Sequence, residues 1–335
     1  MKNLYKLLFL TSMIIGTLIA ISSNSWMSMW VGLEMNLLSI IPLMSNIKNK
    51  MESEAAIKYF ITQAMASTVF MLAMIIMLSN NDSLMTSKLF SMIIDLAILT
   101  KMGAAPFHFW FPEVMEGLSW MNSTIMLTWQ KIAPMAIFMH STKPLMFTTM
   151  IIIASMLVSG VMGINQTSMR KILAYSSINH IGWMIGAMLT NQSLWMIYFI
   201  IYSLMTINIT TMSWSMNIFS INQLINSMNK NKTIKIMFSL NFLSLGGIPP
   251  FIGFFPKWIT INSLIQEKMF LLTFIMIMLT IMTLVFYMRI TFASGIMTTS
   301  ESNLTNKKSI KNSMITFNFI VLSLLSTCPM MISFI

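Results

Sequence analysis

The sequence predicts an all-α polytopic membrane protein with eleven transmembrane helices. Of its 335 residues, 56% are hydrophobic and only 9% are charged, and the mean hydropathy is +0.77. An ordinary soluble domain carries about 25% charged residues, so this chain has too little charge to cover its apolar mass in water. The apolar residues also occur in runs of about 20, the length that a helix needs to cross a bilayer. These observations exclude a soluble globular protein.

Eleven segments have the length and composition of a spanning helix. The first follows Lys2 and Lys6 as in a signal peptide, but no small-residue cleavage pattern comes after it and ten more apolar segments do. We therefore interpret it as the first span. The expected spans are 4–22, 25–45, 56–78, 87–112, 121–140, 145–166, 172–190, 194–218, 234–265, 269–290 and 313–334. An odd number of spans places the two termini on opposite sides of the membrane.

The charges of the loops support this count. If the N-terminus lies on side A, the basic residues of side A are Lys2, Lys6, Lys48, Lys50, Lys58, Arg170, Lys171, Lys230, Lys232, Lys235, Arg289, Lys307, Lys308 and Lys311, and those of side B are Lys88, Lys143 and Lys268. Because basic loops stay on the side from which a protein is inserted, side A is that side. We expect the net charge of +11 to reflect topology and contact with anionic lipids, and no binding of nucleic acid.

Three basic residues that belong to neither side, Lys101, Lys131 and Lys257, lie inside the expected spans, and so does Glu34. Glu34 is about ten residues from either end of its span, which at ~1.5 Å per residue puts it near the bilayer midplane. An ionisable side chain at that depth costs on the order of 3 kcal/mol and usually marks a path for a substrate, an ion or a proton. The alternative is an ion pair between helices that only fixes their packing.

Two of the expected spans contain related strings. Residues 103–112 read GAAPFHFWFP and residues 247–256 read GIPPFIGFFP, with five identities in ten positions and an offset of 144. Proline removes a backbone donor and clashes with the preceding turn, so each helix is expected to break there. Such breaks at membrane depth are tolerated when they are buried in protein or line a wet cavity.

The two strings run in opposite directions through the membrane. This predicts two inverted five-helix repeats, 1–140 and 141–292, with discontinuous helices 4 and 9, as in many transporters. A loop and the last span fill 293–335. The helix break is repeated in both strings, but the position of the lysine is not. Lys101 precedes the first break, whereas Lys257 follows the second.

A third irregularity is expected at Pro134. This residue cannot donate a hydrogen bond to the carbonyl of Gln130, which is next to Lys131 in the sequence. The carbonyl is then available to hold a water molecule beside the ammonium group. A proline kink used only for packing is the other interpretation.

Three strings carry a resemblance to a known family. They are KMGAAPFHFWFPE at 101–113, TWQKIAP at 128–134 and LGGIPPFIGFFPKW at 245–258. They are similar to strings of the antiporter-like membrane subunits of respiratory complex I, NADH:ubiquinone oxidoreductase, and eleven spans resemble the shortened animal mitochondrial form. The 41 methionines and only two arginines are typical of an AT-rich animal mitochondrial genome, with an arthropod-like source.

The resemblance implies roles for the four ionisable residues. Glu34 matches the acid beside the first broken helix, and Lys101 matches its partner lysine. Lys131 matches the central lysine and Lys257 the lysine of the second broken helix. A carboxylate near a buried ammonium favours the charged lysine, so a movement of Glu34 relative to Lys101 makes that lysine hold or release a proton. The proton then passes through water to Lys131 and Lys257.

Two histidines and one acid have less defined roles. His108 and His180 both fall in strings of the family, where a histidine can relay protons. For His108 the alternative is a hydrogen bond to a backbone carbonyl that the helix break leaves free. Asp95 has no counterpart that the resemblance supplies. It precedes Lys101 by six residues, about 240° around a helix, and is expected to face away from that lysine.

The redox chemistry of such a complex is expected on other chains. With one cysteine, Cys328, and three histidines, no internal disulfide and no metal-ligand cluster of the usual spacing is available, and no dinucleotide or phosphate-binding motif is present. NADH, FMN, iron–sulfur clusters and ubiquinone are thus implied on other subunits. The chain is part of an enzyme only as a subunit.

The resemblance also implies partners and location. We expect membrane-arm and accessory subunits and inner-membrane lipids as partners, not an isolated homo-oligomer. The expected location is the mitochondrial inner membrane, with the N-terminus in the matrix and the C-terminus in the intermembrane space. The function implied is redox-coupled proton translocation. The alternatives are a structural scaffold of the membrane arm and a cation/proton antiporter, for which Glu34 and Asp95 offer few ligands to a bare cation.

Overall fold

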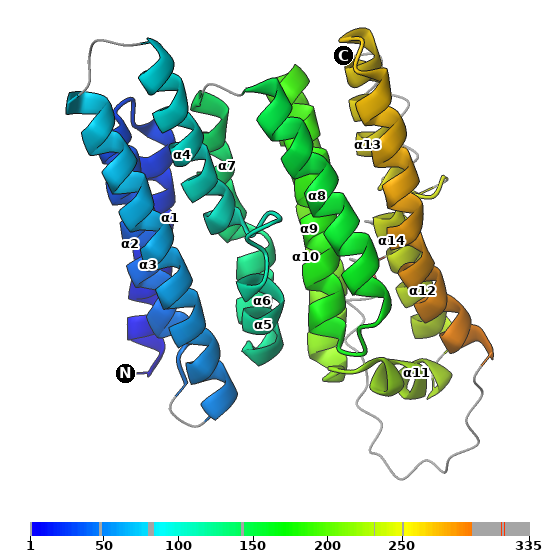
Figure 1. Ribbon diagram of the computed structural model, residues 1–335. Coiled ribbons are helices and arrows are strands. Elements are labelled where there is room, and N and C mark those ends of the chain that lie inside the picture. Colours follow the sequence, from blue (N-terminus) through cyan, green and yellow to red (C-terminus); the bar gives the residue numbers. More distant parts are fainter. Residues whose placement is uncertain are drawn as a thin grey trace. The chain divides into compact units, whose positions relative to one another are not determined.

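The computed structural model describes residues 2–46, 49–79, 84–141, 144–230, 232–249 and 251–296, and residues 316 and 318. These ranges contain fourteen α-helices and no β-strand (Figure 1). The helices are α1 (Lys2–Ser22), α2 (Trp26–Met44), α3 (Lys50–Ser79), α4 (Leu84–Met102), α5 (Trp110–Gly117), α6 (Trp120–Leu127), α7 (Trp129–His140), α8 (Leu145–Ile164), α9 (Met169–Thr190), α10 (Gln192–Met216), α11 (Ile221–Lys230), α12 (Lys232–Gly246), α13 (Phe254–Gln266) and α14 (Phe270–Ile296). The predicted all-helical class is confirmed.

Seven of these helices, α1, α2, α3, α8, α9, α10 and α14, are long and apolar enough to cross a membrane. Three other expected spans, 87–112, 121–140 and 234–265, each coincide with a pair of shorter helices. The expected span 313–334 lies outside the described residues, apart from positions 316 and 318. The chain is therefore a polytopic membrane protein.

The short helix α11 was not expected from the sequence. It has ten residues, too few to cross a bilayer, and buries Leu224, Ile225 and Met228. Leu224 and Ile225 precede Met228 by four and three positions, so the three side chains share one face of the helix. The helix packs with that apolar face inward against α12 and α14.

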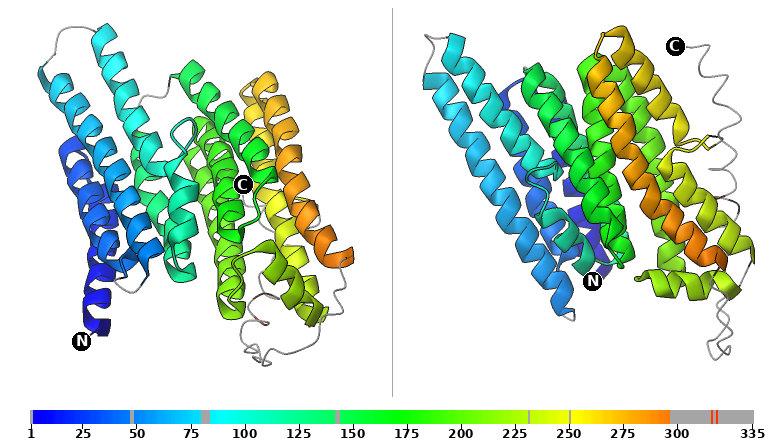
Figure 2. Two further views of the ribbon diagram at one scale, coloured as in Figure 1. Left: turned by 60° about the horizontal axis from the view of Figure 1, so that its bottom comes forward. Right: turned by 45° about the vertical axis from the view of Figure 1, so that its right-hand side comes forward.

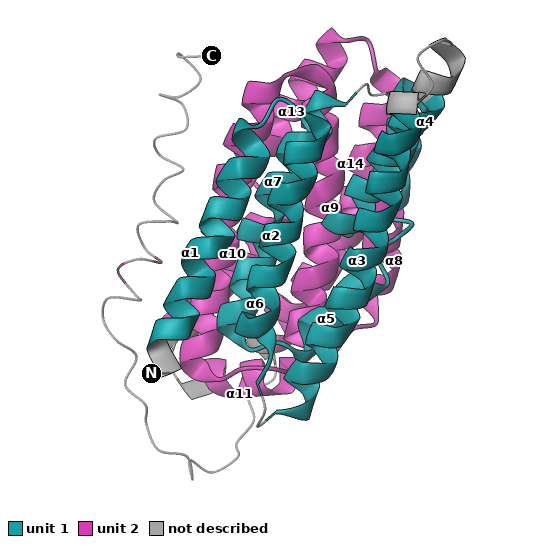
Figure 3. Ribbon diagram, turned by 90° about the vertical axis from the view of Figure 1, so that its left-hand side faces the viewer, with its two compact units in different colours: residues 1–154 teal, residues 155–335 magenta. Residues whose placement is uncertain are grey.

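The chain divides into two compact units, residues 1–154 and 155–335, drawn in different colours in Figure 3. In the first unit, α3 packs against α2, α4 and α5, and α7 packs against α1, α2, α4 and α6. In the second unit, α9 packs against α10, α13 and α14 (Figure 2). In α9, 18 of the 22 residues are buried, so this helix is an inner element of its unit.

Glycine allows a close approach between α1 and α2 in the first unit. A Cβ atom added to Gly32 in α2 would lie 2.6 Å from the backbone nitrogen of Ala20 and 2.8 Å from the carbonyl oxygen of Gly16 in α1. Small residues allow such an approach between membrane helices, where van der Waals packing replaces the hydrophobic effect. The backbones of α1 and α2 are thus in direct contact at this level.

Substituting Gly32→Val is expected to separate α1 from α2. Overpacking of this kind costs about 1–3 kcal/mol, because the clash is with backbone atoms that cannot rotate away. We expect a lower thermal midpoint of the solubilised protein and less of it in the membrane. The neighbouring substitution Val31→Leu, at an exposed side chain of the same helix, is the matched control. Equal stability of the two variants would contradict the packing described.

Candidate functional site

Two interrupted helices form the frame of the candidate site. Helix α4 ends at Met102, and α12 ends at Gly246. The next residues, Gly103 and Gly247, have φ values of 76° and 77°, in the left-handed region that glycine adopts without strain. Each helix therefore stops at a glycine in the same conformation, 144 residues apart.

The hydrogen bonds at the two helix ends also match. In the first break the amide of Ala104 donates to Leu99 O at 3.1 Å and that of Gly103 to Thr100 O at 3.2 Å. In the second, the amide of Ile248 donates to Leu243 O at 3.4 Å and that of Gly247 to Ser244 O at 3.0 Å. Both are Schellman caps, which satisfy the last carbonyl groups of a helix.

The chain then re-enters a helix in the same way. Pro112 is the third residue of α5 and Pro256 the third residue of α13, positions at which a missing amide proton costs no intrahelical bond. Ahead of them, the amide of Phe111 donates to His108 O at 3.0 Å and that of Phe255 to Ile252 O at 3.2 Å. The breaks expected from the Gly and Pro positions are present at both strings.

Glu34 and Lys101 lie within electrostatic range of each other in the first unit. Lys101 is in the last turn of α4 and only 7% exposed, and it interacts electrostatically with the carboxylate of Glu34 in α2. The Oε1 atom of Glu34 is buried and accepts no hydrogen bond from the described residues. A buried carboxylate with so few donors depends on a nearby cation. The two charges on separate helices therefore depend on each other.

Uncharged polar side chains surround this pair. Tyr59 donates its hydroxyl to Gln130 Oε1 at 3.4 Å, and Gln130 Nε2 donates to Asn36 Oδ1 at 3.0 Å. Gln63 Nε2 donates to the backbone oxygen of Lys101 at 3.4 Å. Tyr59 also interacts electrostatically with Glu34. This polar cluster joins α2, α3, α4 and α7 around the charges.

Sequence reasoning missed the contribution of α3 to the polar cluster. Tyr59, Gln63 and Ser67 are four positions apart, so they share one face of the helix, and each is 5% exposed or less. A stripe of uncharged polar residues at helical spacing inside an apolar span is the signal that was available.

Lys131 lies in the first turn of α7 and is only 2% exposed. Its Nζ atom is 5.6 Å from the centroid of the Phe111 ring, a cation–π distance. The helix is interrupted at Thr128, whose amide and hydroxyl both donate to Thr124 O, whereas Pro134 lies inside α7. This interruption, where a threonine hydroxyl shares the helical carbonyl, was not expected from the sequence, and the free Gln130 carbonyl expected from Pro134 stays a prediction.

Lys257 caps the first half of the second broken helix. Its Nζ atom donates to Gly246 O, the end of α12, at 2.8 Å and lies 6.0 Å from the Trp183 ring centroid. Lys101 belongs to the C-terminal turn of α4, so both lysines lie at the end of a first half-helix, where the dipole favours a cation. The sequence positions differ, but a lysine serves the equivalent helix end in each unit.

The two histidines have hydrogen-bond partners in the same units. His108 Nδ1 is 3.2 Å from the carbonyl oxygen of Pro106, which fits the carbonyl-bonding interpretation. His180 Nδ1 is 2.9 Å from the Tyr198 hydroxyl. Asp95 is completely buried in α4, and we assign no role to it.

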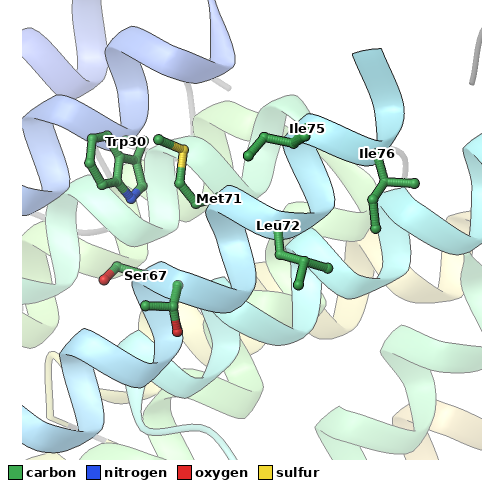
Figure 4. Close-up of a pocket in the computed structure, with 7 residues that line it drawn as sticks. Trp30, Ser67, Met71, Leu72, Ile75 and Ile76 are labelled. Carbon is green, nitrogen blue, oxygen red and sulfur yellow. The ribbon is translucent and has the colours of Figure 1, made fainter. Parts of the chain in front are cut away.

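A groove of about 340 Å³ lies between α2 and α3 (Figure 4). It is lined by Trp30, Ser67, Thr68, Met71, Leu72, Ile75 and Ile76. None of these side chains is ionisable, so the groove is separate in its chemistry from the charged site.

Comparisons with known proteins show the family to which the chain belongs. The family described as "NADH:quinone oxidoreductase/Mrp antiporter, TM" matches residues 23–283. NADH-ubiquinone oxidoreductase chain 2 of Anopheles gambiae is 47% identical over 330 residues, which cover 96% of each chain. The protein of the same name from Locusta migratoria is 45% identical over 327 residues, 97% of this chain and 95% of that one.

A solved structure shares the fold. A chain of respiratory complex I from Thermus thermophilus with bound Aureothin superimposes with a TM-score of 0.86 at 22% identity, covering 96% of this chain and 78% of that one. At this identity the likeness shows a common fold.

The contact at Gly247 generates a prediction. A Cβ atom there would lie 2.8 Å from Lys257 Nζ, and the left-handed backbone costs an alanine about 1–2 kcal/mol. Gly247→Ala is therefore expected to destabilise the protein by at least that amount and to displace the lysine from Gly246 O, measured by thermal unfolding and by the structure of the variant. Gly246→Ala, where the nearest atom is 3.6 Å away, is the control. Equal effects of the two substitutions would contradict the assignment.

Proposed function

Because this chain belongs to the NADH-ubiquinone oxidoreductase chain 2 family, we propose that it is a core membrane-arm subunit of that enzyme and takes part in redox-coupled proton translocation. Matches to insect relatives over nearly the whole chain support this identity. Its partners are the other membrane-arm and accessory subunits and the lipids of the mitochondrial inner membrane. NADH, FMN, iron–sulfur clusters and ubiquinone are proposed to lie on other subunits.

The proposed topology has eleven spans. It counts the seven long helices, the three interrupted pairs and the segment 313–334. The matching caps at Gly103 and Gly247 support a duplication of residues 1–140 as 141–292 in the inverted orientation. The basic loops favour an N-terminus in the matrix and a C-terminus in the intermembrane space.

The observation that carries the proposed mechanism is the buried pair of Glu34 and Lys101. The two side chains come from α2 and α4, so a small displacement between these helices changes the field that the carboxylate exerts on the ammonium. The lysine holds its proton when the carboxylate is near and releases it when the carboxylate withdraws. Redox events in the other subunits supply the displacement.

Released protons need acceptors that are also kept out of lipid. Lys131 is the acceptor proposed in the first unit, because α4 packs against α7 and the polar cluster links both helices. Lys257 is the acceptor proposed in the second unit, with His180 and its partner Tyr198 as an accessory carrier. His108, at the first break, is proposed for a carrier role of the same kind.

Two other functions are compatible with family membership. A cation/proton antiporter needs a cation site, and in the described spans only Glu34 and Asp95 offer carboxylates at mid-depth. A scaffold needs the buried charges only for packing. Neither alternative accounts for lysines kept at the interrupted ends of two half-helices.

Removing either lysine of the first unit tests the mechanism. We expect Lys101→Met and Lys131→Met to abolish proton pumping in the assembled complex, because methionine keeps the volume but holds no proton. The measurement is the number of protons moved per electron in reconstituted vesicles. Lys50→Met, at an exposed lysine that begins α3, is the matched control and is expected to pump normally.

The result also separates the alternatives. An unchanged proton-to-electron ratio in both variants would refute the relay. A reduced amount of complex with normal pumping per complex would indicate a scaffold. Sodium- or potassium-dependent proton exchange by the isolated chain would indicate an antiporter.

A further inference from the structure

Three buried asparagines meet in the second unit. They are Asn208 in α10, Asn241 in α12 and Asn318, which follows α14 in the chain, and they are 1%, 2% and 0% exposed. Asn208 Nδ2 donates to Asn241 Oδ1 at 3.0 Å and to Asn318 Oδ1 at 3.1 Å. Asn241 Nδ2 also donates to Asn318 Oδ1, at 3.0 Å. We call these three residues the asparagine node.

Asn318 is the acceptor on which the asparagine node converges. Its Oδ1 atom receives a hydrogen bond from each of the other two side chains, which come from different helices. An amide in a membrane interior is costly without partners, so a displacement of α10 or α12 relative to Asn318 would break hydrogen bonds that hold these buried amides. A single buried asparagine is known to fix the register of helices in this way.

The asparagine node is connected to the second helix break. Ser244 Oγ donates to the carbonyl oxygen of Asn241 at 2.7 Å. A Cβ atom at Gly253, beyond the break, would collide with the carbonyl oxygen of Ser244. Two residues after Ser244, the carbonyl of Gly246 accepts the ammonium of Lys257. A continuous series of contacts thus runs from Asn318 to Lys257.

Helix α12 needs such a lateral support. It has 15 residues and ends at the break, so no continuing helix fixes its position along its axis. Its last carbonyl nevertheless has to meet Lys257 Nζ at hydrogen-bond distance. Hydrogen bonds to α10 and to Asn318 restrain sliding of the half-helix, whereas apolar contacts to α14 tolerate it.

We propose that Asn318 is a positioning residue, which bonds to both α10 and α12 and thereby holds the end of α12 where Lys257 binds it. The link to Lys257 rests on the proposed function, because that lysine matters only if it carries protons. The tie between the helices is independent of that function. Asn318 lies 77 positions from Asn241 and 110 from Asn208 in the sequence, so the contact joins distant parts of the unit.

The test uses Asn318→Leu in the assembled complex, with Asn318→Ser as the conservative variant and Thr316→Ala as the control at an exposed neighbour. Amide hydrogen exchange at residues 244–247 reports the position of the helix end. We expect it to rise about fivefold or more in Asn318→Leu, less in Asn318→Ser and not in the control. The protons moved per electron are expected to fall by about half or more in Asn318→Leu, with the same order among variants.

The combined substitution Asn241→Leu with Asn318→Leu is expected to add little to either single change, since both remove the same node. Unchanged exchange at residues 244–247 in Asn318→Leu overturns the proposal, whatever pumping does. Raised exchange with normal pumping overturns the link to Lys257 and retains the tie between helices. Normal pumping in Lys257→Met would instead show that the proposed function of that lysine is wrong. The hydrogen-exchange data would still test whether Asn318 links α10 and α12.

Discussion

The proposed mechanism depends on three lysine side chains that are buried inside the protein. An ammonium group in a membrane interior costs on the order of 3 kcal/mol unless the protein supplies a partner. The partners differ: Lys101 has the carboxylate of Glu34, Lys131 has the ring of Phe111, and Lys257 has the carbonyl of Gly246. Interrupted helices and buried amides both meet this need. Each provides dipoles near a lysine that an unbroken apolar helix does not provide.

The two helix breaks have the same backbone structure, but their lysines reach the helix end from different sides. Both breaks have a left-handed glycine, a Schellman cap and a proline in the first turn of the next helix. Lys101 reaches its helix end from within α4, and Lys257 reaches the end of α12 from the following helix. In both cases the lysine lies at the C-terminal end of a half-helix, where the dipole favours a cation.

Much of this arrangement was predictable from local sequence, and the exceptions have a common cause. Long apolar runs identified the helices, and the glycine and proline strings located both breaks. The ionisable residues Glu34, Lys101, Lys131 and Lys257 stood out because charge is rare in a span. Tyr59 and Gln63 did not, because an uncharged polar residue is a small signal until its neighbours are known. The asparagine node joins three distant segments, and no local pattern encodes such a meeting.

The central claim is that these buried groups exchange protons through water. The most direct measurement is a structure of the intact respiratory complex at a resolution that shows internal water molecules. The account predicts ordered waters that connect Glu34, Lys101 and Lys131 through the polar cluster in at least one state of the catalytic cycle. Closely packed apolar side chains between these residues in every state, with no water reaching either lysine, would contradict it.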